Sequence, residues 1–315
     1  MIALAPIHMK VVAHLHFHEP QAVLIRTFLM ALAALAAAAP QTMLAQEKMR
    51  VVTTSADLKS LVEAVGGDRV EAESLAAPEQ DPHAIELKPG QVARLRSAAV
   101  LVRIGLDHEP WLARVLPTSK MLVVDASKTI RLLQTETPRL RVERQAHVHA
   151  YGNTHYWLDP HNARPITTSI LTALATLRPA EKAIFEATRD AFLARLDARI
   201  SEWEIALKPY RGTKVVVVHD SWAYFGERFG LQIVAAAEPH PGIPPSPAEL
   251  AALFTRMREA GVRVLIADPH ANPALVRQIA EKGGATSVTL FPSGPDYIAL
   301  FEENVKRLAE TLKAD

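Results

Sequence analysis

Short apolar runs alternate with amphipathic stretches along most of this chain. The strand-like runs of the first half cover residues 49–56, 70–76, 98–105 and 121–127, and those of the second half cover 214–219, 231–238, 262–268 and 286–291. Helix-like segments separate the runs in both halves, in the same order. Because a continuously apolar strand is buried on both faces, this pattern predicts parallel sheets with helices on both sides. We therefore expect an α/β protein with two similar parallel-sheet lobes.

One long helical stretch separates the two halves. Pro179 suits the first turn of a helix, and the sequence then runs without Gly or Pro as far as Pro209. A helix of this length would cross a whole domain. We expect a rigid linking helix at 179–209, between a first lobe at 46–178 and a second lobe at 210–315. Because one stiff connection limits hinge motion, the cleft between the lobes should be largely preformed.

Residues 1–45 have the pattern of a secretory signal peptide. Arg26 lies just before the apolar run FLMALAALAAAA, which is too short to span a bilayer and has the length of a signal-peptide core. Cleavage after Ala45 is the best match, but Met43 is larger than the residue usually found two places before the cut, and Met9 is an alternative start. We expect export to the periplasm, with the cleavage bond left open.

Composition removes several classes of function. The chain has 315 residues, 49% apolar and 22% charged, which is enough for one or two hydrophobic cores. Its 35 basic and 34 acidic side chains give a net charge of +1, so no overall field favours nucleic acid or an anionic membrane. The absence of cysteine excludes disulfides, iron–sulfur clusters and thiol catalysis. Any metal site must use His, Asp, Glu or water.

Three histidines lie where predicted elements begin or end. His83 follows the strand at 70–76 through a short loop, His155 precedes WLDP, where Asp159 can cap a helix, and His219 directly follows the strand VVVV. Ligands of open parallel sheets collect beyond the carboxyl ends of the strands, and neutral imidazole is a common zinc ligand. A single histidine after a strand is usually structural, but three at one predicted crevice favour a metal site. We expect two ligands from the first lobe and one from the second to bind one ion between the lobes.

Five longer phrases carry a resemblance to a known family. DPHAIELKP, GLDHEPWL, HYWLDP, VVVVHDSWAYFGERFGL and EPHPGIPPSP follow one another in this order. With them, the sequence from Arg50 to Leu312 resembles the solute-binding proteins of zinc and manganese ABC transporters, the ZnuA- and TroA-like family. The resemblance implies two α/β lobes joined by one long helix, and a monomer that binds a divalent metal and delivers it to a membrane permease. It also implies that His83, His155 and His219 bind the metal and that the protein is not an enzyme.

The fourth ligand is left open by the sequence. Many family members have an aspartate in a TDS-like phrase after the last strand, where this chain has Pro292 and Ser293. Asp268 ends a strand of the same lobe and is one alternative. Asp296 is a second, although it is also well placed to cap the last helix, and a water molecule is a third.

The ligand types favour Zn²⁺ over Mn²⁺. Three imidazoles with at most one oxygen suit zinc, whereas manganese sites are usually richer in carboxylate and water. Manganese-binding members of the family tend to have a glutamate where this chain has His219. The resemblance and the ligand chemistry therefore point to the same ion.

The remaining histidines of the predicted mature chain have weaker claims. His147 and His149 lie in a polar segment where zinc-binding members often carry a longer histidine-rich loop. They either collect metal for the site or belong to a solvated loop. The other histidines after residue 46 are expected to be structural or exposed: His108, His161, His240 and His270.

Two other functional classes remain as alternatives. Three histidines and an open position also describe a catalytic zinc site of a hydrolase, with Glu86, Asp159 or Asp220 as a nearby base. No HExxH pattern supports this. A two-lobed scaffold can also bind a metal chelate, but such a ligand needs a larger cavity with aromatic or Arg side chains, and only 6% of the residues are aromatic.

Overall fold

The computed structural model of the protein describes residues 47–78, 80, 83, 85–116, 121–134, 152–238 and 243–314. The predicted signal peptide, His147, His149 and His240 lie outside these residues. Among the helices that the structure describes, none is both long enough and apolar enough to cross a membrane.

Two four-stranded parallel sheets form the centres of two lobes. The first sheet contains β1 (Met49–Thr53), β2 (Val70–Ser74), β3 (Val100–Arg103) and β4 (Leu122–Asp125). The second contains β5 (Lys214–Val217), β6 (Gln232–Ala236), β7 (Val264–Ala267) and β8 (Thr286–Thr289). The strand orders are β2-β1-β3-β4 and β6-β5-β7-β8, so the chain passes through both sheets in the same way. The predicted α/β fold with two similar lobes is confirmed.

The central strands are buried on both faces. In β3, Val102 faces the main core while Leu101 faces a smaller cluster on the other side of the sheet. In β5, Val215 and Val217 face the main core while Val216 faces a separate cluster of the second lobe. Because side chains alternate along a strand, an apolar residue is needed at every position, which explains the continuous runs in the sequence.

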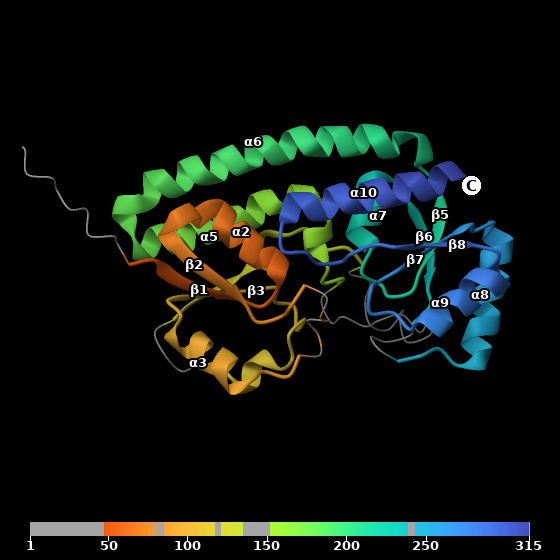
Figure 1. The fold of residues 1–315 in the computed structure, drawn as a ribbon, viewed down its shortest axis with the longest axis horizontal. Coiled ribbons are helices and arrows are strands. Elements are labelled where there is room, and N and C mark those ends of the chain that lie inside the picture. The colour runs from red at the N-terminus through yellow and green to blue at the C-terminus, as the bar shows by residue number, and fades with distance from the viewer. Residues whose placement is uncertain are drawn as a thin grey trace, which may run out of the picture. The chain divides into compact units, whose positions relative to one another are not determined.

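Helices cover both faces of each sheet (Figure 1). In the first lobe, the helices are α2 (Ala56–Gly66) and α5 (Ala163–Leu177) on the main-core face and α3 (Pro89–Ser97) on the other. In the second lobe, they are α7 (Ala223–Phe229) and α10 (Tyr297–Ala314) on the main-core face, with α8 (Pro247–Ala260) and α9 (Pro273–Gly283) on the other. Both lobes therefore bury one helical layer against a shared core.

The long linking helix is α6 (Lys182–Leu207), with 26 residues. It contacts α2 and α5 of the first lobe and also α10, which lies beside it in Figure 1. Near its end the ring of Trp203 stacks on Phe301 of α10, with 5.4 Å between the ring centroids. The long helix predicted between Pro179 and Pro209 is confirmed, whereas the exact lobe boundaries stay predictions.

The second lobe also contacts the first through the start of α10. The backbone N–H of Tyr297 donates to Ser60 Oγ at 3.0 Å, and its phenol donates to the carbonyl of Trp157 at 2.6 Å. Just before this helix, Asp57 of α2 accepts hydrogen bonds from Ser293 and Gly294. The loop between β8 and α10 is thus bound to the first lobe.

Candidate metal site

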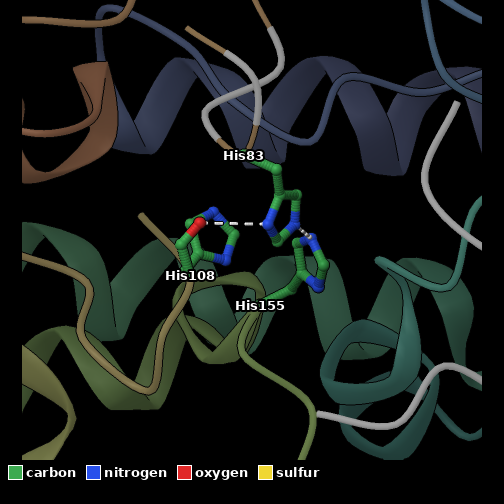
Figure 2. Close-up of side chains that lie close together, drawn as sticks. All are labelled: His83, His108 and His155. Atoms are coloured by element: carbon green, nitrogen blue, oxygen red, sulfur yellow. Dashed lines mark hydrogen bonds between the residues drawn. The ribbon is translucent and has the colours of Figure 1, made fainter. Parts of the chain in front are cut away.

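His83 and His155 meet at the edge of the first lobe. His83 follows β2, is half-buried, and holds its Nδ1 at 3.1 Å from the backbone carbonyl of His108. His155 is buried and stands immediately before the 3₁₀ turn Tyr156–Leu158. The two Nε2 atoms are 3.4 Å apart (Figure 2).

Asn153 fixes the orientation of the His155 ring. Its Oδ1 accepts from the backbone N–H of His155 at 3.0 Å and lies 3.1 Å from His155 Nδ1. Its Nδ2 donates to the carbonyl of Asp220 in the second lobe at 2.8 Å and to Gln134 Oε1 at 3.0 Å. The side chain of Asn153 therefore connects a candidate ligand of the first lobe with the loop that follows His219.

His219 comes from the second lobe. It lies two residues after β5, is 7% exposed, and holds its Nδ1 3.5 Å from Oε2 of Glu238, which lies two residues after the neighbouring strand β6. Its ring centroid is 5.5 Å from that of His155 and 6.1 Å from that of His83. The three histidines that the sequence predicts as ligands thus lie together, one in the second lobe and two in the first.

The hydrogen-bond partners define which nitrogen of each ring faces the site. Nδ1 of His83 lies against a carbonyl oxygen, that of His155 against an amide oxygen, and that of His219 against a carboxylate. The Asn153 side-chain atom that faces His155 Nδ1 must be the amide oxygen and not the nitrogen, because the same atom accepts from the backbone N–H of His155. Since carbonyl and amide oxygens only accept, these contacts favour the neutral tautomer of His83 and His155 with the hydrogen on Nδ1 and the lone pair that can bind a metal on Nε2. The carboxylate of Glu238, 3.5 Å from His219 Nδ1, favours the same arrangement in His219.

The spacing of these rings suits a tetrahedral ion. Two nitrogens bound to zinc at about 2.05 Å lie about 3.3 Å apart, close to the 3.4 Å between Nε2 of His83 and Nε2 of His155. Two lone pairs at this distance repel each other, and a cation between them removes the repulsion. The ring centroids of zinc-bound imidazoles lie about 5 Å apart, and the 5.4 Å between His83 and His155 and the 5.5 Å between His155 and His219 are near this value.

A small cavity opens beside His155 and His219. It has a volume of about 20 Å³, and its walls also include Trp157, Ser293 and His270. A cavity of this volume has room for about one water-sized species. This cavity is too small to hold a metal chelate such as a siderophore or a vitamin.

The structure also places the residues considered for a fourth ligand. Asp268 is buried and its Oδ1 accepts from the indole of Trp222 at 3.1 Å. Asp296 caps α10, since its Oδ1 accepts from the N–H of Ala299 at 2.8 Å. Ser293, in the loop after the last strand, donates to Asp57. The prediction that Asp296 caps the last helix is confirmed.

The structure also places the carboxylates considered as catalytic bases. Asp159 accepts from Arg228 through both oxygens, at 2.8 and 3.0 Å, and caps the turn Pro160–Asn162 as predicted. Glu86 is exposed. Asp220 Oδ1 lies 3.4 Å from Gln134 Nε2, which donates to it.

His108 was not among the predicted ligands, but it lies in the cluster. It is fully buried, and nitrogen atoms of His83, His108 and His155 lie within 4.8 Å of one another (Figure 2). His161 and His270 are exposed. One signal in the sequence could have selected His108. It lies five residues after β3, and the strand order reverses between β1 and β3. Ligands of parallel sheets collect at the point where the strand order reverses.

The next residue anchors the loop that carries His108. Glu109 accepts from Thr54 Oγ1 at 2.6 Å, from the N–H of Ile104 at 2.7 Å and from the N–H of Gly105 at 3.1 Å. Burial raises the pKa of Glu109, and these hydrogen bonds oppose the increase. The loop after β3 is therefore attached to the end of β1, which fixes where His108 lies.

Several known proteins resemble this chain. The high-affinity zinc uptake protein ZnuA of Yersinia pestis is 26% identical over 267 residues, which cover 79% of this chain and 84% of that protein. The zinc-binding lipoprotein AdcA of Streptococcus pneumoniae is 25% identical over 85% of this chain, but the match spans only 56% of AdcA. This chain thus corresponds to about half the length of that relative.

Solved structures agree with the sequence matches. A crystal structure of ZnuA superposes with a TM-score of 0.74 at 27% identity, covering 84% of this chain and 99% of that one. A zinc-bound deletion mutant of ZnuA gives a TM-score of 0.73 at 28% identity, covering 84% of this chain and 98% of that one. The family described as zinc-uptake complex component A, periplasmic, matches residues 51–311. This chain belongs to that family.

Proposed function

We propose that this protein binds one zinc ion through Nε2 of His83, His155 and His219 and delivers it to the membrane permease of an ABC transporter. The observation that carries the proposal is the meeting of three imidazoles from two lobes, each with its Nδ1 against an oxygen acceptor. Ligands held in one tautomer and orientation bind a metal more tightly, because no ring has to reorganise.

The position of the site explains how one ion can be held and released. His83 and His155 belong to the first lobe and His219 to the second, so a change in the separation of the lobes changes the number of ligands. A protein that delivers its ion must lose affinity when it meets the permease. Small movements of the lobes are enough to weaken binding, because a zinc–nitrogen bond near 2 Å tolerates a displacement of only about 0.2 Å.

Zinc is preferred to manganese in this proposal. Three neutral imidazoles suit zinc, while manganese favours carboxylate and water. The names of the relatives, a high-affinity zinc uptake protein and a zinc-binding lipoprotein, support the same ion. The family description supports a periplasmic location, and we propose that the protein works there as a monomer.

Calorimetric titration of the metal-stripped protein tests binding. We expect one tight zinc equivalent and much weaker binding of manganese. The matched control is His161→Ala, which removes an exposed histidine away from the cluster and should leave zinc binding unchanged. If the triple replacement of His83, His155 and His219 by Ala keeps the wild-type zinc affinity, the proposal is wrong.

Delivery needs a separate test in cells. A strain without this gene should grow poorly when a chelator limits zinc, and the wild-type gene should restore growth. A variant that binds no zinc should fail to restore growth while reaching the same abundance. Equal rescue by both would show that zinc capture by this site is not what the cell requires.

A further inference from the structure

His108 occupies a position that a structural role does not fully explain. It is 0% exposed, and one of its nitrogens lies within 4.8 Å of nitrogens of both His83 and His155. Its ring centroid is 5.3 Å from that of His155, close to the separation of His155 and His219. Figure 2 shows His83 between His108 and His155.

The backbone before His108 is held in an unfavourable conformation. Leu106 and Asp107 have φ values of 58° and 57°, and they follow Gly105 at 81°. Non-glycine residues rarely adopt the left-handed region, so two in succession are strained. Glu109 holds this turn through the N–H groups of Ile104 and Gly105. Strain of this kind persists where a structure has to place a particular side chain, and the side chain that follows the turn is His108.

The ring of His108 is also fixed in orientation. Its Nδ1 lies 2.7 Å from Thr154 Oγ1, and Thr154 directly precedes His155. Nδ1 is therefore turned to the hydroxyl, and Nε2 is the nitrogen that can serve as a ligand atom. The carbonyl of the same residue accepts from His83 Nδ1. One residue thus orients His83 through its backbone and adds an imidazole beside it.

The oxygen groups considered for the fourth position are less well placed than this imidazole. Asp296 caps α10, and Ser293 donates to Asp57. Asp268 is buried, and its Oδ1 accepts from the indole of Trp222 at 3.1 Å. His83, His108 and His155, by contrast, form a cluster of potential metal-binding groups.

From these observations we infer that His108 is the fourth ligand, so that the ion is bound by four imidazoles: His83, His108, His155 and His219. The inference rests on the proposed function and adds a ligand to the same site. Three of the four rings then come from the first lobe, and the second lobe contributes one. Four nitrogen ligands also strengthen the discrimination against manganese, which prefers oxygen.

The inference requires local rearrangement on binding. The rings of His83 and His219, with centroids 6.1 Å apart, must come closer together, and those of His83 and His108 must separate. The rings of His83 and His108 are 3.8 Å apart and tilted by 42°, closer than the separation of about 5 Å between two imidazoles on a tetrahedral zinc. The rings must therefore move apart by about an ångström when the ion binds. A zinc-loaded crystal structure should show this separation.

X-ray absorption spectroscopy of the zinc-loaded protein counts the imidazoles directly. We expect four in the wild-type protein. His108→Leu should retain three imidazoles and take an oxygen ligand in place of the fourth. Its zinc affinity should be about 100- to 1,000-fold lower, because one of four ligands contributes about a quarter of the binding free energy. The matched control is Thr154→Val, which removes the hydroxyl at Nδ1 but keeps the imidazole, and it should retain four imidazoles with a loss of at most about 10- to 100-fold.

The outcomes separate this inference from the proposed function. Three imidazoles and an oxygen in the wild-type protein would overturn the role of His108 while leaving zinc capture intact, and this measurement does not depend on whether a variant folds. An unchanged imidazole count in His108→Leu would overturn it as well. Failure of the wild-type protein to bind zinc tightly would instead refute the proposed function.

Discussion

The two lobes share one sheet topology but differ in what they contribute to the site. Beyond its strands, the first lobe supplies His83, His108 and His155, and these are connected by hydrogen bonds through a backbone carbonyl and through Thr154 and Asn153. The second lobe supplies His219, supported by Glu238. The same fold thus provides three of the four proposed ligands in one copy and a single one in the other. In the proposed site, the first lobe would therefore supply most of the binding, and the second lobe would control retention of the ion.

The largest expected effect tests this division between lobes. His155→Ala removes a ring that contacts His83, His108 and His219, so we expect zinc affinity to fall by about 1,000-fold or more. His219→Ala leaves the first-lobe cluster intact, and we expect a smaller loss of about 100-fold. Competition against a chelator of known affinity measures both constants. Equal losses in the two variants would contradict the difference between the lobes.

A second comparison concerns the contact between the lobes. Asp57 of the first lobe is fully buried and bonded to Ser293 and Gly294 of the loop after β8, at 2.7 and 3.1 Å. Burial raises the pKa of Asp57 from 3.8 to about 7, against the lowering effect of these hydrogen bonds. The folded protein therefore binds this proton more tightly than the unfolded chain does. Its contribution to stability is complete below pH 3.8 and is lost as the pH rises toward about 7.

Asp57→Asn should remove this dependence on pH. The amide keeps an acceptor for Gly294 and a donor for Ser293 and cannot ionise. Between about pH 4 and pH 8, the free energy of unfolding of the wild type should fall by roughly 4 kcal/mol relative to that of the variant. Urea unfolding of the metal-free proteins measures this difference. The control, Asp190→Asn on exposed α6, should not reproduce it, and parallel pH profiles for wild type and Asp57→Asn would contradict the prediction.

Much of the fold follows from local sequence pattern. The runs that became β3 and β5 are apolar at every position because both faces of each sheet are covered, and this property is visible without any structure. The long helix was visible as an uninterrupted stretch after Pro179. His219 was predictable because a residue directly after a parallel strand lies at the edge where ligands collect.

The remaining features depend on contacts that local pattern does not contain. Asp57 and Ser293 are 236 residues apart in sequence, so nothing near either residue predicts their hydrogen bond. The left-handed turn at Leu106 and Asp107 uses residues that rarely adopt this conformation, so local pattern did not predict the turn that buries His108. The oxygen acceptors for each Nδ1 likewise come from loops and strands that only the fold brings together.

The smallest expected effect concerns Asn153, which is not a proposed ligand but orients the ring of His155. Asn153→Ala removes the oxygen that orients Nδ1 of His155 and the donor to the carbonyl of Asp220, so zinc affinity should fall by about 10- to 100-fold. The matched control is Asn162→Ala, which removes a hydrogen bond to the carbonyl of Tyr156 in the same segment without touching the ring. We expect this control to lower stability by about 1 kcal/mol and to leave the zinc dissociation constant unchanged. If both variants lose affinity equally, the effect comes from the stability of the segment, and Asn153 does not act through the orientation of the imidazole.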